Sequence, residues 1–292
     1  GSSRRGRQPL SMIGRLAGGR RGVIRWERAM VVEVNGTRLW YEQEGEGPDL
    51  LLVPGLGAST HVWYPQMRAL APLLRVTVVD PRGHGQSGKP AGSYSMRLFA
   101  DDYAALLRQL GIRQAVVAGS SMSSLAAVEM AAAYPELVRG IVLVGGFAAL
   151  APAARERMAA RAGLAESQGM APLAEMVPQT AMGAWTHATN PGLVGLFRAI
   201  IAANDPAAYA TAVRAVAEAD VTALLPQVRC PALVLLGEQE QVAPLPYARA
   251  LKAGLPDADL RVLPRCGHLP FLEQPAEFNA ALQEWLLARA VA

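Results

Sequence analysis

A serine near the middle of the chain stands where a buried strand is expected to change directly into a helix. The strand-like run 114–119 ends at Gly119, and an alanine-rich helical pattern, 122–134, begins just after Ser121. Small residues two positions either side, Gly119 and Ser123, allow the strand and helix backbones to pass closely. Such a turn presents the hydroxyl above the sheet at a helix N-terminus, whose dipole favours developing negative charge. Ser121 is therefore the candidate nucleophile for attack on a carbonyl carbon.

Attack by a serine requires a base and a site for the oxyanion that forms. A serine hydroxyl is a weak nucleophile at neutral pH until a neighbouring base accepts its proton. Histidine, with an ordinary pKa of about 6.5, suits this exchange. The oxyanion needs preorganised N–H donors, each contributing about 3–4 kcal/mol. The histidines available as the base are His61, His84, His187 and His268.

Short apolar runs alternate with helical patterns from residue 30 onward. Asn35-Gly36 separates the first two runs and predicts a β-hairpin. The later runs are apolar throughout, which is typical of parallel strands buried on both faces. This alternation predicts an α/β fold with a mostly parallel central sheet flanked by helices on both faces. The strand-like runs are 30–34, 37–43, 50–53, 75–80, 114–119, 140–146, 232–237 and 260–263, and the helical patterns are 61–73, 96–110, 122–134, 245–254 and 275–290.

One long segment, 148–226, interrupts the alternation. It contains no convincing strand, is rich in alanine, and has apolar residues at helical spacing between several prolines. An all-helical insertion between two strands of one sheet is expected to lie over the carboxyl edge of that sheet as a lid. The expected organisation is a basic N-terminal extension at 1–29, a core formed by 30–147 and 227–292, and a lid at 148–226.

Further segments resemble the α/β-hydrolase family in its lid-bearing branch. Residues 54–57, Pro-Gly-Leu-Gly, follow the apolar run 50–53, where that family places its oxyanion loop. Residues 80–87 match its D-x-R-G-x-G-x-S turn, and residues 237–240 match the G-x-x-D loop that carries the acid. Gly267-His268 matches the surroundings of the family's catalytic histidine. The resemblance covers about residues 31–292 and implies the α/β-hydrolase fold.

The resemblance also implies a role for each residue of the site. His268 would accept the proton of Ser121, and Glu240 would orient the imidazole and stabilise its charge. The order serine, acid, histidine along the chain is that of the family. The backbone N–H groups of Leu56 and Met122 are the implied oxyanion donors. An acyl-enzyme would form on Ser121, and water activated by His268 would release it.

Two positions depart from the family pattern. Ser123 replaces the second glycine of G-x-S-x-G, and Ser124 follows where glycine is also frequent. Serine is small, so we expect a formed but slightly strained turn. The acid is a glutamate, whose extra methylene requires a shifted loop.

Other acids and histidines compete for the same roles. Glu238 lies two residues before Glu240, and its position on the loop makes it the weaker candidate. His84 is expected to brace a glycine-flanked turn, and His61 to cap a helix or line a pocket. Neither is expected to replace His268 as the base.

The predicted reaction is hydrolysis of a carboxylic ester or lactone of modest size. The lid tract 185–220 and the run 272–275 resemble 3-oxoadipate enol-lactone hydrolases, which open a small lactone bearing carboxylates. Candidate substrate-binding residues are Trp185, His187 and Gly57. The predicted partner is therefore a small-molecule ester or lactone.

Two alternatives stay open. The same triad could cleave a C–C bond in a ring-fission diketone, with Arg198 or Arg214 holding a charged dienoate. The protein could instead be a weakly active or inactive ligand-binding homologue, a reading suggested by Ser123-Ser124. An ester assayed beside a ring-fission diketone would separate the first alternative from the main prediction.

Composition and charge bear on the cellular location, the cofactors and the partners of the protein. The chain has 292 residues, is 51% apolar and carries a net charge of +4. Eight arginines against Glu27 give residues 1–29 a charge of +7, which leaves −3 for the rest. Two distant cysteines and no membrane-length apolar run favour a reduced, cytoplasmic location. We expect no cofactor, no metal, no nucleic acid and no membrane partner, and nothing in the sequence specifies an oligomeric state.

Overall fold

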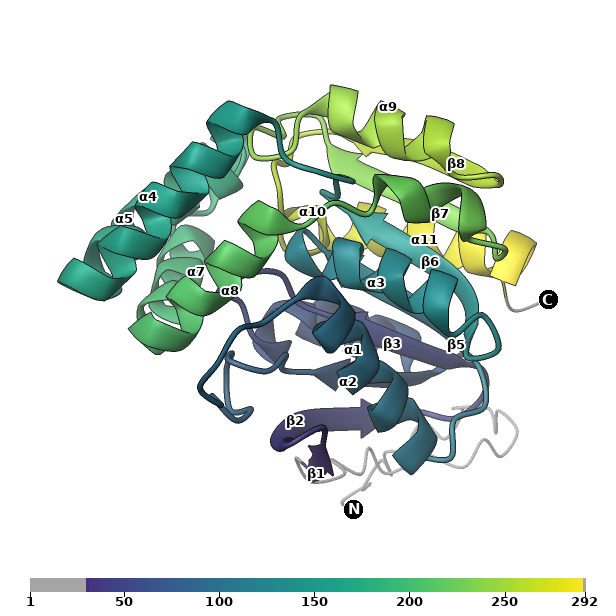
Figure 1. The fold of residues 1–292 in the computed structure, drawn as a ribbon. Helices are drawn as coiled ribbons and strands as arrows, with labels where there is room; N and C mark the ends of the chain where they lie inside the picture. The colour runs from purple at the N-terminus through teal and green to yellow at the C-terminus, as the bar shows by residue number, and fades with distance from the viewer. Residues whose placement is uncertain (1–29, 291–292) are drawn as a thin grey trace, which may run out of the picture.

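The computed structural model describes residues 30–290, which contain one eight-stranded sheet (Figure 1). Its strand order is β1-β2-β4-β3-β5-β6-β7-β8. Each strand expected from the sequence is present, with its ends moved by two residues at most. The strands are β1 (Met30–Val34), β2 (Thr37–Glu44), β3 (Asp49–Val53), β4 (Arg75–Val79), β5 (Ala115–Ser120), β6 (Val138–Val144), β7 (Ala232–Gly237) and β8 (Ala258–Leu263).

The sheet is antiparallel at one edge and parallel elsewhere. β1 and β2 form a hairpin, with Asn35 and Gly36 at φ 43° and 74°. Positive φ at both central residues is what a tight hairpin turn requires, and Asn-Gly supplies it at low cost. β2 pairs antiparallel with β4, and the pairs from β4 to β8 are all parallel. The predicted mostly parallel sheet is confirmed.

Helices cover both faces of the sheet, so the inner strands β3 to β7 bury both sets of their alternating side chains. Leu51 and Val117 face the core under α2, α3 and α9, whereas Leu50 and Val116 face the core under α1 and α11. The predicted helices are all present, although 61–73 begins as a 3₁₀ turn at Thr60–Trp63. The helices of the core are α1 (Tyr64–Leu70), α2 (Met96–Gln109), α3 (Met122–Ala133), α9 (Leu245–Gly254), α10 (Pro270–Glu273) and α11 (Pro275–Trp285), which continues as a π-helical turn at Leu286–Ala290.

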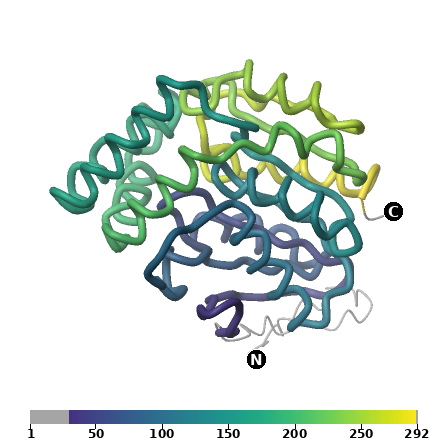
Figure 2. Tube along the Cα trace, viewed as in Figure 1, coloured from purple at the N-terminus to yellow at the C-terminus, as the bar shows by residue number. Residues whose placement is uncertain are grey.

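The predicted helical insertion is confirmed, and its helices project from one end of the sheet (Figure 1). The chain leaves the core after β6 and returns before β7 (Figure 2). At this neck Ala149 bridges Asp220, and Val221 N–H donates to the Ala148 carbonyl at 2.9 Å. The helices of this lid are α4 (Pro152–Gln168), α5 (Ala171–Ala181), α6 (Ala184–Thr189), α7 (Pro191–Ala202) and α8 (Pro206–Glu218), followed by a 3₁₀ turn at Thr222–Gln227.

The domain limits at 148 and 226 stay predictions, and the predicted extension at 1–29 lies outside the described residues. Within the described part of the chain, no helix has the length and apolar character needed to cross a membrane.

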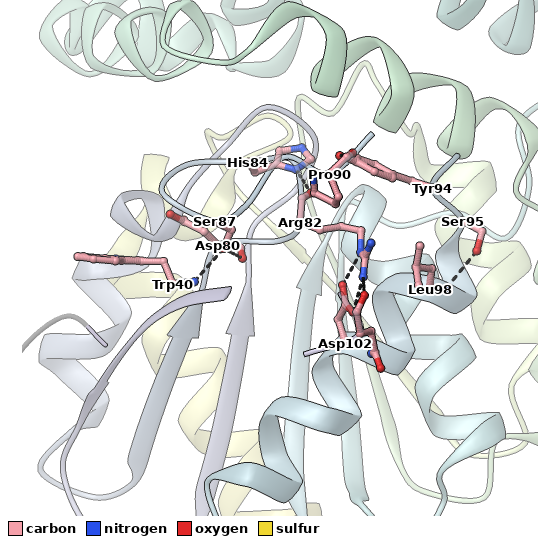
Figure 3. Close-up of polar contacts among 11 residues, drawn as sticks. Trp40, Asp80, Arg82, His84, Ser87, Pro90, Tyr94, Ser95, Leu98 and Asp102 are labelled. Carbon is pink, nitrogen blue, oxygen red and sulfur yellow. Dashed lines mark hydrogen bonds and ion pairs between the residues drawn. The ribbon is translucent and has the colours of Figure 1, made fainter. Parts of the chain in front are cut away.

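The turn after β4 is held by buried polar contacts (Figure 3). Asp80 Oδ1 accepts from Thr60 N–H at 2.6 Å, and its Oδ2 accepts from Gln86 N–H at 2.7 Å. Arg82 points at Asp102 of α2 and donates to both carboxylate oxygens, at 2.6 and 2.7 Å. Such a two-pronged pair fixes the turn against the helix because the fork of the guanidinium matches the carboxylate.

His84 lies within this turn and is fully buried. Its Nδ1 donates to the Arg82 carbonyl oxygen at 2.9 Å, and its Nε2 has no hydrogen-bond partner among the described residues. Burial lowers the pKa of His84 to about 4, because the charged imidazolium would lose its hydration. His84 is therefore neutral in the folded protein at physiological pH.

We expect His84 to make the fold sensitive to mild acid. Unfolded histidine takes up a proton near pH 6.5, whereas folded His84 does so only near pH 4, so stability falls as pH drops between these values. From about pH 7.5 to about pH 5 the loss attributable to His84 is about 2 kcal/mol. Urea unfolding of the wild type and His84→Asn at both pH values measures it. An equal pH dependence in the two proteins would contradict the prediction.

Candidate active site

Ser121 occupies a strained turn between β5 and α3. Its φ of 49° and ψ of −113° lie in a region that few residues with a side chain adopt. The turn is closed so tightly that a Cβ on Gly119 would lie 2.1 Å from the Ser123 carbonyl oxygen. Ser121 N–H donates to the Val144 carbonyl at 2.8 Å, which anchors the turn to β6. Strain of this kind at a single polar side chain is a feature of functional sites.

The two serines that replace the family's glycines bind the backbone around this turn. Ser123 Oγ donates to the Pro54 carbonyl at 2.6 Å, and Ser124 Oγ donates to the Ser121 carbonyl at 2.6 Å. Both residues are about 1% exposed. A glycine could make neither hydrogen bond. The two serines therefore add one hydrogen bond from α3 to the loop after β3 and one from α3 to the turn itself.

Glu240 and His268 meet behind the turn. His268 Nδ1 and Glu240 Oε2 lie 2.6 Å apart, and both side chains are buried. Glu240 Oε1 accepts from the backbone N–H groups of Val242 and Ala243, at 2.7 and 3.0 Å. A carboxylate at Nδ1 makes that nitrogen the donor and leaves Nε2 free to accept a proton.

The charge state of Glu240 suits this pairing. Burial would raise its pKa, but the nearby His268 and the two backbone N–H donors outweigh burial and hold the pKa below its ordinary value. Gly145, at φ 56°, leaves room for the pair, since a Cβ there would lie 2.7 Å from His268 Nδ1. Glu238 is exposed and accepts from the backbone N–H of Arg265, so it does not contact His268.

A cavity opens in front of these groups, between the core and the lid. Ser121 and His268 both line it, and Leu56 lies in its wall beside the lid residues Met158 and Phe197. Its volume is about 50 Å³. The N–H groups of Leu56 and Met122 make no hydrogen bond among the described residues. The lining residues are Gly55, Leu56, Ala58, Ser120, Ser121, Met158, Arg161, Val177, Thr180, Ala181, Phe197, Val216, Val242, His268 and Leu269.

The sequence of the fold and of the site matches a known protein family. Residues 48–275 match the alpha/beta hydrolase fold family. The chain belongs to this family. The match includes the turn at Ser121, Glu240 and His268, as well as the lid between β6 and β7.

Three similar proteins are named as an enol-lactonase, a putative carbamate hydrolase and an esterase. The chain is 30% identical to 3-oxoadipate enol-lactonase 2 of Acinetobacter baylyi over 82% of its own length and 89% of that protein. It is also 30% identical to a putative carbamate hydrolase of a Caulobacter strain, over 86% and 97% of the two chains. A thermophilic esterase from Thermogutta terrifontis, solved with malate bound, matches with a TM-score of 0.83, 31% identity and coverage of 89% and 97%.

The structure moves the predicted lid contacts away from the cavity. Trp185 is 44% exposed and lies under the guanidinium of Arg265, 5.4 Å from its ring centroid. His187 contacts the Pro178 carbonyl through Nε2 at 3.2 Å. Neither residue is among those that line the cavity.

Gly57 also lies outside the lining and holds the loop after β3 against the lid. Its carbonyl accepts from Asn204 Nδ2 at 2.7 Å. A Cβ on Gly57 would lie 2.8 Å from the Tyr209 ring, so the loop and α8 are in direct contact. Its φ of 74° adds a second reason for glycine at this position.

Two arginines considered for a charged substrate lie on the surface instead. Arg198 pairs with Glu175 at 2.8 Å, and Arg214 pairs with Glu166 at 2.7 Å. All four side chains are about half exposed, so these arginines are paired and do not line the cavity. The cavity instead receives Arg161, which the sequence alone did not single out. A possible sequence signal was its spacing: Arg161 lies three residues after Met158, so the two share one face of α4.

Glu273 is a second residue that the sequence did not single out for the site. Its carboxylate connects the lid to the loop that carries His268, accepting two hydrogen bonds from each. The four donors are Gly183 N (2.7 Å), Thr186 Oγ1 (2.6 Å), Gly267 N (2.9 Å) and Leu269 N (3.2 Å). His268 N–H itself donates to the lid carbonyl of Ala181 at 2.7 Å. The lid is thus attached to the histidine loop at this point.

Glu273→Gln is expected to lower kcat by about 10-fold or more on a hydrolysed ester. An amide nitrogen in place of one oxygen would face N–H donors, which displaces the loop, and small displacements of catalytic groups reduce rates strongly. Glu284→Gln is the matched control, since its surface pair with Arg261 joins α11 to β8 and does not involve the histidine loop. Equal rates for Glu273→Gln and wild type would contradict a positioning role for Glu273.

Proposed function

We propose that this protein is a serine hydrolase that cleaves a small carboxylic ester or lactone through an acyl-enzyme on Ser121. The observation that carries the proposal is the 2.6 Å contact between His268 Nδ1 and Glu240 Oε2 behind a cavity lined by Ser121 and His268. The names of two similar proteins, an enol-lactonase and an esterase, support the same reaction class.

Each residue has a defined chemical role in this proposal. Ser121 Oγ adds to the carbonyl carbon while its proton passes to His268 Nε2. Glu240 holds Nδ1 as the protonated nitrogen and stabilises the imidazolium, a task that its lowered pKa favours. His268 then gives the proton to the leaving oxygen, and the acyl group stays on Ser121. A water molecule, activated by the same imidazole, releases the acid.

The oxyanion would be held by the N–H groups of Leu56 and Met122. Both are backbone donors beside the nucleophile, and neither makes a hydrogen bond among the described residues. Met122 is the first residue of α3, where the helix dipole favours negative charge. Donors fixed before the reaction stabilise the transition state without reorganisation.

The cavity supports a short substrate. Its volume is about 50 Å³ and most of its lining is aliphatic or aromatic. The similar Thermogutta terrifontis esterase was solved with malate, a small molecule, bound. We therefore place short acyl esters and small lactones ahead of long-chain esters.

Pre-steady-state hydrolysis of p-nitrophenyl butyrate tests the proposal. We expect a burst of p-nitrophenol approaching one per chain, with the butyryl group found on Ser121 by peptide mass spectrometry. A small lactone and a ring-fission diketone assayed beside the ester define the bond that is cleaved. Turnover of the diketone alone would favour the C–C bond alternative. No turnover and no acyl adduct with any of the three would leave the ligand-binding alternative.

A further inference from the structure

Arg161 introduces a single permanent charge into the cavity. It lies on α4 of the lid and lines the same space as Ser121 and His268. Among the described residues of the lining, no other side chain carries a permanent charge and none is a carboxylate. Met158, Phe197 and the other lid contributions are mostly apolar. The cavity thus combines an apolar wall with one cation.

The guanidinium of Arg161 is without an anionic partner in the described part of the chain. Its Nε is buried and makes no hydrogen bond there, and no described carboxylate lies within ion-pair distance of it. Arg198 and Arg214 of the same lid are both paired with glutamates. A partly buried cation without a counter-charge is costly unless a ligand supplies one.

An aromatic ring fixes the position of this cation. The guanidinium lies over Tyr209 of α8, 5.2 Å from the ring centroid. The same ring packs on Gly57, next to Leu56 in the oxyanion loop. Stacking on a ring occupies the face of the guanidinium and leaves its N–H edge available for a planar acceptor. The cation therefore sits beside the loop that would hold the reacting carbonyl.

We propose that Arg161 is a carboxylate-binding subsite, and that the substrate is a small ester or lactone with an anionic group a few carbons from the reacting carbonyl. This inference rests on the proposed hydrolase function. The guanidinium fork can donate two parallel hydrogen bonds to a carboxylate. The aliphatic lining packs on the chain between the two groups, and the small cavity keeps that chain short.

Matched substrates test the subsite. Mono-p-nitrophenyl glutarate carries a carboxylate on the acyl side, and p-nitrophenyl pentanoate is its neutral counterpart. 4-Acetoxybenzoate and 4-methylphenyl acetate form a second pair, with the carboxylate on the leaving group. The proteins compared are the full-length wild type, Arg161→Gln, Arg161→Lys and Arg157→Gln. Arg157 lies one turn earlier on α4, is exposed, and serves as the charge-matched control.

The expected result is selective loss of the anionic substrate. In at least one pair, wild type prefers the anionic ester, and Arg161→Gln lowers its kcat/KM by about 10- to 100-fold, mostly through KM. The neutral partner changes by less than about 3-fold. Arg161→Lys retains part of the preference because the charge remains while the fork is lost. Arg157→Gln behaves as wild type. An equal fall on both members of each pair, or no preference in the wild type, would overturn the subsite.

Binding of free glutarate, measured by calorimetry, separates this inference from the proposed function. It needs no turnover, so it remains informative if no ester is hydrolysed. Binding to the wild type that is lost in Arg161→Gln would support the subsite even then. Absence of glutarate binding to the wild type, together with no preference for anionic esters, would overturn the subsite while leaving the hydrolysis of neutral esters intact.

Discussion

Ser121→Ala is expected to lower kcat for p-nitrophenyl butyrate by about 10³-fold or more. Without the hydroxyl no acyl-enzyme can form, and only the oxyanion donors and substrate binding remain. Alanine meets the same strain as serine at a φ of 49°. The Ser121 hydroxyl makes no hydrogen bond among the described residues, so we expect the free energy of unfolding to change by less than about 0.5 kcal/mol.

Ser120→Ala is the matched control for this experiment. Ser120 is the preceding residue, lines the same cavity, and has a buried hydroxyl without a hydrogen-bond partner in the described structure. Its loss should reduce kcat by less than about 10-fold. Steady-state kinetics and urea unfolding of both variants give the comparison. If Ser121→Ala retained wild-type kcat, Ser121 could not be the nucleophile.

Glu240→Gln is expected to lower kcat by about 10⁴-fold, with little change in KM. Glu240 now accepts His268 Nδ1–H through one oxygen and two backbone N–H groups through the other. Glutamine has one acceptor oxygen, so either the imidazole or the Val242–Ala243 backbone must face an amide N–H. The first arrangement favours the wrong tautomer of His268, and both remove the charge that stabilises the imidazolium.

Glu238→Gln is the control, because Glu238 is exposed on the same loop and does not contact His268. We expect its kcat to remain within about 2-fold of the wild-type value. Thermal unfolding of both variants checks that the loop still folds. A large loss in Glu238→Gln with a small loss in Glu240→Gln would reverse the assignment of the acid.

Most of the fold could be predicted from local patterns. The apolar runs specify strands because a parallel strand buried on both faces tolerates few polar side chains. Asn35-Gly36 specifies the hairpin because few other pairs adopt positive φ at both positions. Gly119 and Ser123 mark the tight turn because only small residues allow the backbones to approach so closely. These features depend on neighbours in sequence, so one sequence suffices to find them.

The choice between Glu238 and Glu240 shows where local reasoning ends. Both glutamates lie on one loop with the same functional group, and the resemblance alone favoured the second. The structure brings Glu240 to His268 because Val242 and Ala243 bind its other oxygen, while Gly145 leaves room for the pair. The N–H groups of Val242 and Ala243 belong to the backbone, so the residue types at these positions do not show that they bind Glu240.

The sequence by itself determined the candidate catalytic residues and their order along the chain: a serine at a strand-to-helix turn, then a loop that carries an acid, and then a histidine near the end. Only the tertiary structure decided which lid residues meet that chemistry. It leaves Trp185 and His187 outside the cavity lining, brings Arg161 into it, and ties the lid to the histidine loop through Glu273. The physical reason is that helical periodicity defines the faces of a lid helix, whereas packing against the core decides which face covers the cavity.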